Sequence, residues 1–146
     1  MTRTAEIFQQ LDNNKFATDT GVKMHKKLQY ISEHTDTELF KKISADKTLS
    51  EFFGSNSKTE VPIAGTINGK FISRRIDRLY INNSDKIIAV IDYKTDVNRE
   101  TFYSTYVYQV SEYISLLRHI YPDYRIDGYI LWTHDFLLEK IPTKHI

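Results

Sequence analysis

The chain has 146 residues, 40% of them hydrophobic and 27% charged, which is the balance of a soluble globular protein with one core. Its formal net charge of +1 does not fit a protein that coats duplex nucleic acid by neutralising many phosphates. The absence of cysteine excludes disulfides, thiolate metal sites, iron–sulfur clusters and a cysteine nucleophile, and it favours a reducing, cytoplasmic compartment.

The front of the chain, about residues 1–55, has the periodicity of helices. Its first ten residues lack the apolar centre of a signal peptide, and no apolar run in the chain is long enough to cross a membrane. Apolar side chains recur every three or four residues, which is the helical spacing. The predicted helices are residues 3–11, 21–34, 36–43 and 47–53.

From Glu60 onward the pattern changes to that of strands. The predicted strands are residues 60–67, 70–81 and 86–94, which are rich in β-branched and aromatic side chains. Asn68-Gly69 between the first two strands is a strong hairpin signal, and residues 82–85 form a second turn. The third strand is apolar on both faces at 87–91, which is typical of a central strand covered on both sides.

A long helix and two short strands complete the predicted fold. The helix covers residues 101–121 and carries Tyr106, Gln109, Tyr113, Leu116 and Leu117 on one side. Strands are expected at 128–133 and 136–141. Because a strand, a crossover helix and a strand normally give parallel neighbours, we expect the strand at 128–133 beside the third strand. The sequence thus predicts one α/β domain that covers residues 1–146. Its mixed sheet and long helix lie at about residues 58–141, and helices flank the sheet.

Ionisable side chains gather where the central strand ends. Asp92 and Lys94 share one face because strand side chains alternate with a period of two. A two-residue turn at 83–84 would place Asp77 opposite Val90 and make it a diagonal neighbour of Asp92, about 7–8 Å away. Two carboxylates at that distance can share a divalent cation, and an ammonium beside them can stabilise charge on a phosphoryl group. The pattern predicts metal-assisted phosphodiester hydrolysis.

Further residues would complete such a site. Glu60 offers another carboxylate, and His25, on a predicted helix, offers an imidazole ligand. Arg74, Arg75 and Arg78 place basic groups beside the site, which suits binding to a DNA backbone. Purely structural roles remain open for these features. His25 could be a core histidine with its hydrogen bonds satisfied, Asp92 and Lys94 could form a salt bridge at a strand end, and the three arginines could lie on a solvated strand face.

Four of these features resemble, in order and spacing, the motifs of the RecB-like nuclease domain. This domain is the C-terminal nuclease of AddA and RecB helicase–nucleases, within the PD-(D/E)XK superfamily. The matching residues are His25, Asp77, the run Asp92-Tyr93-Lys94-Thr95, and the helical pair Gln109 and Tyr113. The resemblance extends from about Gly21 to about Trp132. One departure is Arg74, which stands where the family commonly has glycine.

The resemblance implies a restriction-endonuclease-like core, a cofactor and roles for individual residues. The implied metal ligands for Mg²⁺ or Mn²⁺ are His25, Glu60, Asp77, Asp92 and the carbonyl of Tyr93. The implied catalytic residues are Lys94, Asp92, Asp77, Gln109 and Tyr113, of which the last two would brace the site or contact DNA. The lack of cysteine points to the branch of the superfamily without an iron–sulfur cluster.

The sequence is therefore interpreted as that of a metal-dependent deoxyribonuclease, exonuclease-like, acting in DNA end processing or double-strand break repair. Expected partners are single-stranded or frayed DNA ends and a helicase subunit, supplied separately or on a longer native chain. Two alternatives stay open: a non-catalytic DNA-end-binding module on the same fold, and a dimeric structure- or site-specific endonuclease. One-metal and two-metal mechanisms are both compatible with the residues.

Overall fold

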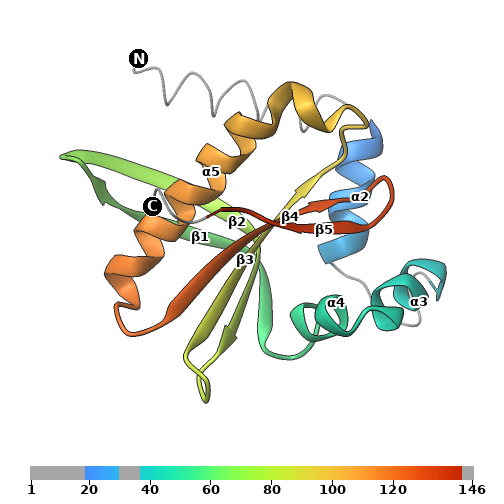
Figure 1. Cartoon of the computed structure of the whole chain (residues 1–146), viewed down its shortest axis with the longest axis horizontal. Helices are drawn as coiled ribbons and strands as arrows, with labels where there is room; N and C mark the ends of the chain where they lie inside the picture. The colour runs from blue at the N-terminus through green and yellow to red at the C-terminus, as the bar shows by residue number, and fades with distance from the viewer. Residues whose placement is uncertain (1–18, 30–36, 143–146) are drawn as a thin grey trace.

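A mixed five-stranded sheet forms the centre of the molecule, with helices on both faces (Figure 1). The computed structural model describes residues 19–29 and 37–142. The strands lie in the sheet in chain order, β1 to β5, so that each strand is the neighbour of its predecessor. The predicted α/β architecture, with a mixed sheet flanked by helices, is confirmed.

Among the described residues, three helices precede the sheet: α2 (Asp19–Gln29), α3 (Thr37–Ala45) and α4 (Lys47–Phe52). The side chain of Asp46 caps α4 by accepting a hydrogen bond of 3.0 Å from the Leu49 N–H. The helices predicted at 36–43 and 47–53 are confirmed with small shifts at their ends. The helix predicted at 21–34 is described only as far as Gln29, and the one predicted at 3–11 lies outside the described residues.

The strands are β1 (Ser57–Ile67), β2 (Lys70–Asn82), β3 (Ile87–Lys94), β4 (Arg125–Trp132) and β5 (Leu137–Lys140). Between β3 and β4 runs the long helix α5 (Arg99–Ile120), and the two strands it joins are parallel, as predicted. The other pairs of neighbouring strands are antiparallel. Strand β3 is the middle strand of the sheet, in agreement with its continuous apolar sequence.

The hairpin between β1 and β2 turns at the predicted dipeptide. Asn68 has φ 52° and Gly69 has φ 77°, the left-handed conformations that a two-residue hairpin loop requires, and Ile67 pairs with Lys70. The Asn-Gly signal therefore predicted this turn correctly.

The register between β2 and β3 differs from the prediction. Leu79 faces Val90, whereas a two-residue turn would have placed Asp77 there. The loop is longer because Asn82 pairs with Ile87, which leaves four residues, 83–86, in the connection. In this loop the Asp85 N–H donates to the side chain of Asn82. The register continued by one position places Asp77 directly across from Asp92, so the predicted diagonal relation is wrong.

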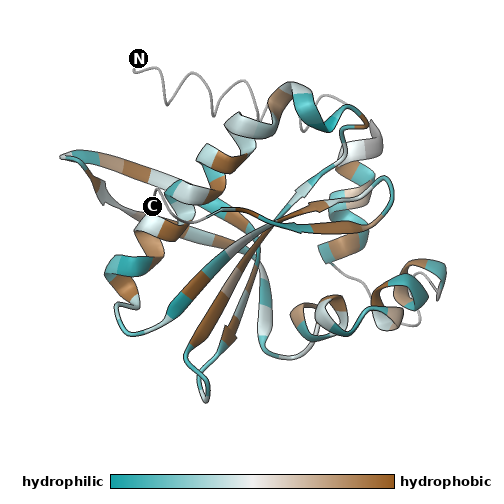
Figure 2. Ribbon diagram, viewed as in Figure 1, coloured by the Kyte–Doolittle hydropathy of each residue, from teal (hydrophilic) through white to brown (hydrophobic). Residues whose placement is uncertain are grey.

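Two apolar clusters, one on each face of the sheet, form the core. On one face α5 packs on the sheet, and on the other α2, α3 and α4 do so, with apolar residues concentrated along the inner strands (Figure 2). The contact between α5 and β4 is close: a Cβ at Gly128 would lie 2.5 Å from a side-chain carbon of Val110. None of the described helices is both long and apolar enough to cross a lipid bilayer.

Candidate active site

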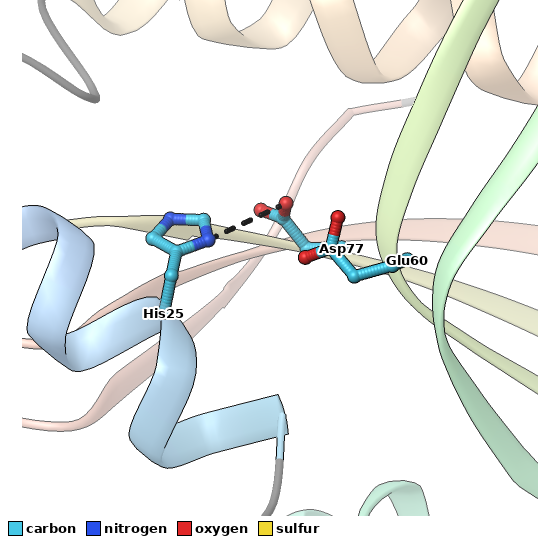
Figure 3. A group of neighbouring side chains, drawn as sticks. All are labelled: His25, Glu60 and Asp77. Atoms are coloured by element: carbon cyan, nitrogen blue, oxygen red, sulfur yellow. Dashed lines mark ion pairs between the residues drawn. The ribbon is translucent and has the colours of Figure 1, made fainter.

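Three ionisable side chains from three separate elements converge beside the central strands (Figure 3). His25 comes from α2, Glu60 from β1 and Asp77 from β2, and their ligand atoms all lie within 4.8 Å of one another. His25 and Asp77 are buried, with relative exposures of 6% and 4%, and His25 Nδ1 lies 3.7 Å from Asp77 Oδ1. We call these three residues the cation group.

Asp77 is held in place by the backbone of β3. The ladder between β2 and β3 ends at Arg78 and Ile91. Beyond it the Tyr93 N–H donates a hydrogen bond of 2.8 Å to Asp77 Oδ2. The Asp77 carboxylate thus accepts a β3 N–H that a backbone carbonyl of β2 would accept in a continued ladder. Its other oxygen, Oδ1, faces His25.

Glu60 has an unusual backbone conformation. Its φ of 52° lies in the left-handed region, which is strained for a residue other than glycine. The β1–β2 pairs on either side of it are Thr59 with Arg78 and Val61 with Ile76, so Glu60 stands at a break in the ladder across from Asp77. Arg75 Nη1 lies 3.8 Å from its carboxylate. At this break the Glu60 carboxylate lies beside the other two members of the cation group, His25 and Asp77.

The donor atoms of the cation group fit a divalent metal ion. Carboxylate oxygens are the preferred ligands of Mg²⁺ and Mn²⁺, and an imidazole nitrogen is acceptable to Mn²⁺. Glu60 and Asp77 bring two carboxylates close together, an arrangement that a cation stabilises. The residues present therefore fit the ion that the sequence predicts.

A second group of polar side chains lies under α5 and is linked by hydrogen bonds. Lys94 Nζ is 2.7 Å from Asp92 Oδ2 and donates to Gln109 Oε1 at 2.9 Å. Gln109 Nε2 in turn donates to the Tyr113 hydroxyl at 3.1 Å. All four are buried, with relative exposures of 0% to 3%. We call them the lysine group; the sequence named all four as site residues, and the structure brings them together.

Tyr106 belongs beside the lysine group, although the sequence assigned it only to the buried side of the helix. The Lys94 ammonium lies 4.4 Å from the centre of its ring, which is a cation–π contact. Burial raises the pKa of Tyr106, so its hydroxyl keeps its proton, and that hydroxyl bonds to Asp96. The signal that could have identified it is its position three residues before Gln109 on one helical face.

The two groups come from neighbouring strands, β2 and β3, yet Asp92 is engaged with Lys94 and is not one of the three residues whose ligand atoms cluster. The sharing of one ion by Asp77 and Asp92 remains a prediction, as does the ligation by the Tyr93 carbonyl. The ring of Tyr93 points to the other face of the sheet, where it meets His25 with centroids 5.4 Å apart.

Arg78, which the sequence predicts to bind DNA, is buried and hydrogen-bonded to three groups of the protein. It is 5% exposed and donates to the Tyr93 hydroxyl, to Ser57 Oγ and to the Leu28 carbonyl at 2.6 to 2.8 Å. Its guanidinium also lies 4.0 Å from the centre of the Phe53 ring. The residue ties α2 to the sheet, and contact of Arg78 with the DNA backbone remains a prediction that its burial does not favour.

The other two arginines have carboxylate partners. Arg74 Nε lies 3.3 Å from Glu112 Oε1 on α5, and the Arg74 side chain is 22% exposed. Burial raises the pKa of Glu112, while Arg74 and Lys70 oppose that rise. The Arg75 side chain is 70% exposed beside Glu60. Of the three arginines, Arg75 has the most exposed side chain, and DNA binding by Arg74 and Arg75 remains a prediction.

The fold and the site together define an α/β protein in which β2 and β3 separate around buried carboxylates. The chain matches no protein-family model and no curated protein. Its fold is similar to that of a solved structure from Eubacterium rectale, described as a "Putative exonuclease". The TM-score is 0.51 at 12% sequence identity, over 97% of this chain and 60% of that one. The likeness shows the fold, and this chain spans 60% of the length of that protein.

Proposed function

We propose that this chain is a metal-dependent DNA nuclease of the RecB-like type, which hydrolyses phosphodiester bonds at DNA ends. The observation that carries the proposal is the cation group, whose ligand atoms lie within 4.8 Å of one another beside a buried carboxylate–ammonium pair. The sequence motifs and the fold shared with a "Putative exonuclease" support the same activity.

The residues that would hold the ion are His25, Glu60 and Asp77, with Asp92 on the neighbouring strand. When bound, Mg²⁺ or Mn²⁺ supplies Lewis acidity toward a phosphoryl oxygen and toward a water. Asp77 is fixed for this role by the Tyr93 N–H, and His25 by its place on α2.

Lys94 contributes a positive charge whose position is fixed in advance. Its ammonium is held by Asp92 and Gln109, with the ring of Tyr106 beside it. A charge that does not need to reorganise stabilises the negative charge that develops on phosphate in the transition state. Tyr113 fixes the orientation of the Gln109 amide, so that its oxygen faces Lys94.

One observation favours a second candidate function. Asp92 and Lys94 are 0% and 3% exposed, so a phosphate can reach the ammonium only if neighbouring groups move. A module that binds DNA ends without cutting them would need no such access. We therefore keep the non-catalytic module as the alternative.

The test is a cleavage assay with end-labelled linear DNA and closed-circular DNA, each in Mg²⁺, Mn²⁺ or EDTA. The nuclease predicts loss of label from linear DNA with either metal and none in EDTA. Intact DNA in every condition, together with retained DNA binding, would favour the non-catalytic module. Rapid cleavage of the closed circle would instead indicate an endonuclease.

A further inference from the structure

A hollow of about 230 Å³ opens at the carboxyl ends of β3 and β4. Its walls come from α2, α3 and the turn between β4 and β5. The polar and aromatic residues among those that line it are Lys27, Glu38, Lys42, Thr133, His134 and Phe136. We call it the β4–β5 hollow. Ligands of open α/β sheets bind by preference outside the carboxyl ends of the strands.

The hollow is connected directly to the strand that carries Lys94. The backbone N–H and the side-chain hydroxyl of Thr133 both donate to the Lys94 carbonyl, at 2.9 and 3.2 Å. Thr133 is 5% exposed, so this wall is fixed. On α2, the lining residue Lys27 follows His25 by two residues. The hollow therefore adjoins the backbone at Lys94 and the helix that carries His25.

The charges around the hollow suit an anion. Lys27 and Lys42 bring two ammonium groups from two different helices, and His134 adds a ring nitrogen from the turn. One carboxylate, Glu38, lies among them, which leaves a net positive charge. The volume is below the about 300 Å³ at which pockets for drug-sized ligands begin, and it suits a phosphate group.

The turn that forms the rim is strained. Phe136 has φ 57°, and an aromatic residue in the left-handed region costs free energy that the surrounding structure must supply. Its ring lies 5.9 Å from the Lys42 ammonium, within the range of a cation–π contact. Strained residues concentrate at ligand clamps, and here the strain holds an aromatic ring against a lysine at the rim.

We propose that the β4–β5 hollow binds a phosphate group of the nucleic-acid strand that enters the candidate active site. The inference rests on the proposed function and gives the enzyme a backbone contact in place of the buried Arg78. Free inorganic phosphate has the same chemistry, so the experiment must separate the two sources.

The first arm measures binding of a fluorescent single-stranded oligonucleotide by anisotropy, in Ca²⁺ to limit cleavage, at several salt concentrations. The variant is Lys42→Gln and the matched control is Lys41→Gln, an adjacent exposed lysine that does not line the hollow. Lys42→Gln should weaken binding about three- to tenfold and reduce the slope of log K against log salt by about 0.7, the value of one phosphate contact. Lys41→Gln should leave the slope unchanged.

The second arm titrates inorganic phosphate and follows the amide resonances of Thr133 and His134 by NMR. These resonances should shift in the wild type and in Lys41→Gln, and much less in Lys42→Gln. Shifts without any difference in oligonucleotide binding between the variants would indicate a free-phosphate site and overturn the proposal. The absence of both effects would also overturn it.

The two proposals can fail separately. If the wild type cleaves no DNA, and Lys42→Gln binds the oligonucleotide more weakly than the wild type does, the result supports phosphate binding in the hollow and contradicts the nuclease activity. A protein that cleaves DNA, with equal slopes for Lys42→Gln and Lys41→Gln, supports the nuclease and contradicts the hollow. Because both lysines are exposed, equal thermal midpoints should show that both variants are folded.

Discussion

The cation group, from α2, β1 and β2, and the lysine group, from β3 and α5, are held in different ways. In the lysine group each member bonds to the next, from Asp92 through Lys94 and Gln109 to Tyr113. In the cation group, His25 Nδ1 and Asp77 Oδ1 are 3.7 Å apart, longer than a hydrogen bond. Its members are anchored by their own elements and brought near one another.

This difference separates stability from ligand binding. A buried ion pair with hydrogen-bonded neighbours becomes costly when one partner is removed. Two carboxylates that converge gain from a cation, and without one their charges oppose each other. Substitutions in the lysine group should therefore reduce folding stability, whereas substitutions in the cation group should mainly reduce metal affinity.

The largest effect is expected for Lys94→Ala. The free energy of unfolding should fall by about 3–5 kcal/mol, because Asp92 is left as a buried charge without its partner. Cleavage, measured below the unfolding transition, should slow about a hundredfold or more, while the Mn²⁺-induced thermal shift persists. Denaturant unfolding and single-turnover assays provide the two measurements.

The matched control for this variant is Lys47→Ala, an exposed lysine on α4, which should change neither quantity. If Lys94→Ala cleaved DNA at the wild-type rate, another residue would have to supply the positive charge.

For Asp77→Asn we expect the opposite pattern. Asparagine retains an oxygen that can accept the Tyr93 N–H, so the metal-free stability should change by less than about 1 kcal/mol. The stabilisation by Mn²⁺, about 2.7 kcal/mol for wild type at a hundredfold excess over Kd, should be lost. Differential scanning fluorimetry with and without Mn²⁺ measures it, with the exposed Asp123→Asn as control. Equal metal shifts in the two proteins would remove the cation site.

Tyr93→Phe tests a residue that contacts two members of the cation group, Asp77 through its backbone N–H and His25 through its ring. Its hydroxyl accepts from Arg78 Nε, and burial raises the pKa of Tyr93, so the hydroxyl keeps its proton. Loss of the acceptor leaves a buried guanidinium donor unsatisfied, at about 1–3 kcal/mol. Because Arg78 also ties α2 to the sheet, Mn²⁺ affinity should fall a few-fold, as measured by titration.

Tyr124→Phe is the matched control for this change, because its hydroxyl bonds to Asn83 at an exposed position. Its unfolding free energy should fall by less than that of Tyr93→Phe. Equal losses in the two variants would argue against a structural role for Arg78.

The smallest expected effect is in the pH dependence of stability. Burial raises the pKa of Glu112, so the folded protein holds this proton more tightly than the unfolded chain. The contribution of Glu112 to the free energy of unfolding is present in full below the ordinary glutamate pKa. It is lost as the pH rises through the raised pKa of the folded protein. Glu112→Gln should lack this decline, while Glu100→Gln, an exposed glutamate on α5, should retain it. Urea unfolding between pH 4 and 7 measures the difference.

Much of the fold followed from local sequence pattern. The alternation of apolar residues, the Asn68-Gly69 turn and the order of strand, helix and strand each depend on neighbouring residues, and each agreed with the structure. The register of β2 and β3 did not agree, because residues 82–87 are compatible with loops of different lengths. The pattern alone could not show that Lys86 adopts φ 53° and lengthens the loop.

The candidate site was predictable in its members but not in its grouping. The spacing of two residues predicted that Asp92 and Lys94 share one face of their strand. The helical repeat predicted that Gln109 and Tyr113 share one side of their helix. The separation of a cation group from a lysine group depends on the break in β1 at Glu60, where a non-glycine residue takes a positive φ. The same break ends strict alternation in β2, so sequence could not distinguish the buried Arg78 from the exposed Arg75.

The sequential order of the strands bears on how the protein assembles during synthesis. Hairpins close locally and quickly, so β1, β2 and β3 can pair while the rest of the chain is still on the ribosome. The pairing of β3 with β4 must wait for α5, which closes the longer loop. Asp77 and Asp92 are therefore brought together early, whereas Lys94 acquires its Gln109 partner only when α5 docks. A nascent chain released before α5 would carry the carboxylates without a fixed ammonium.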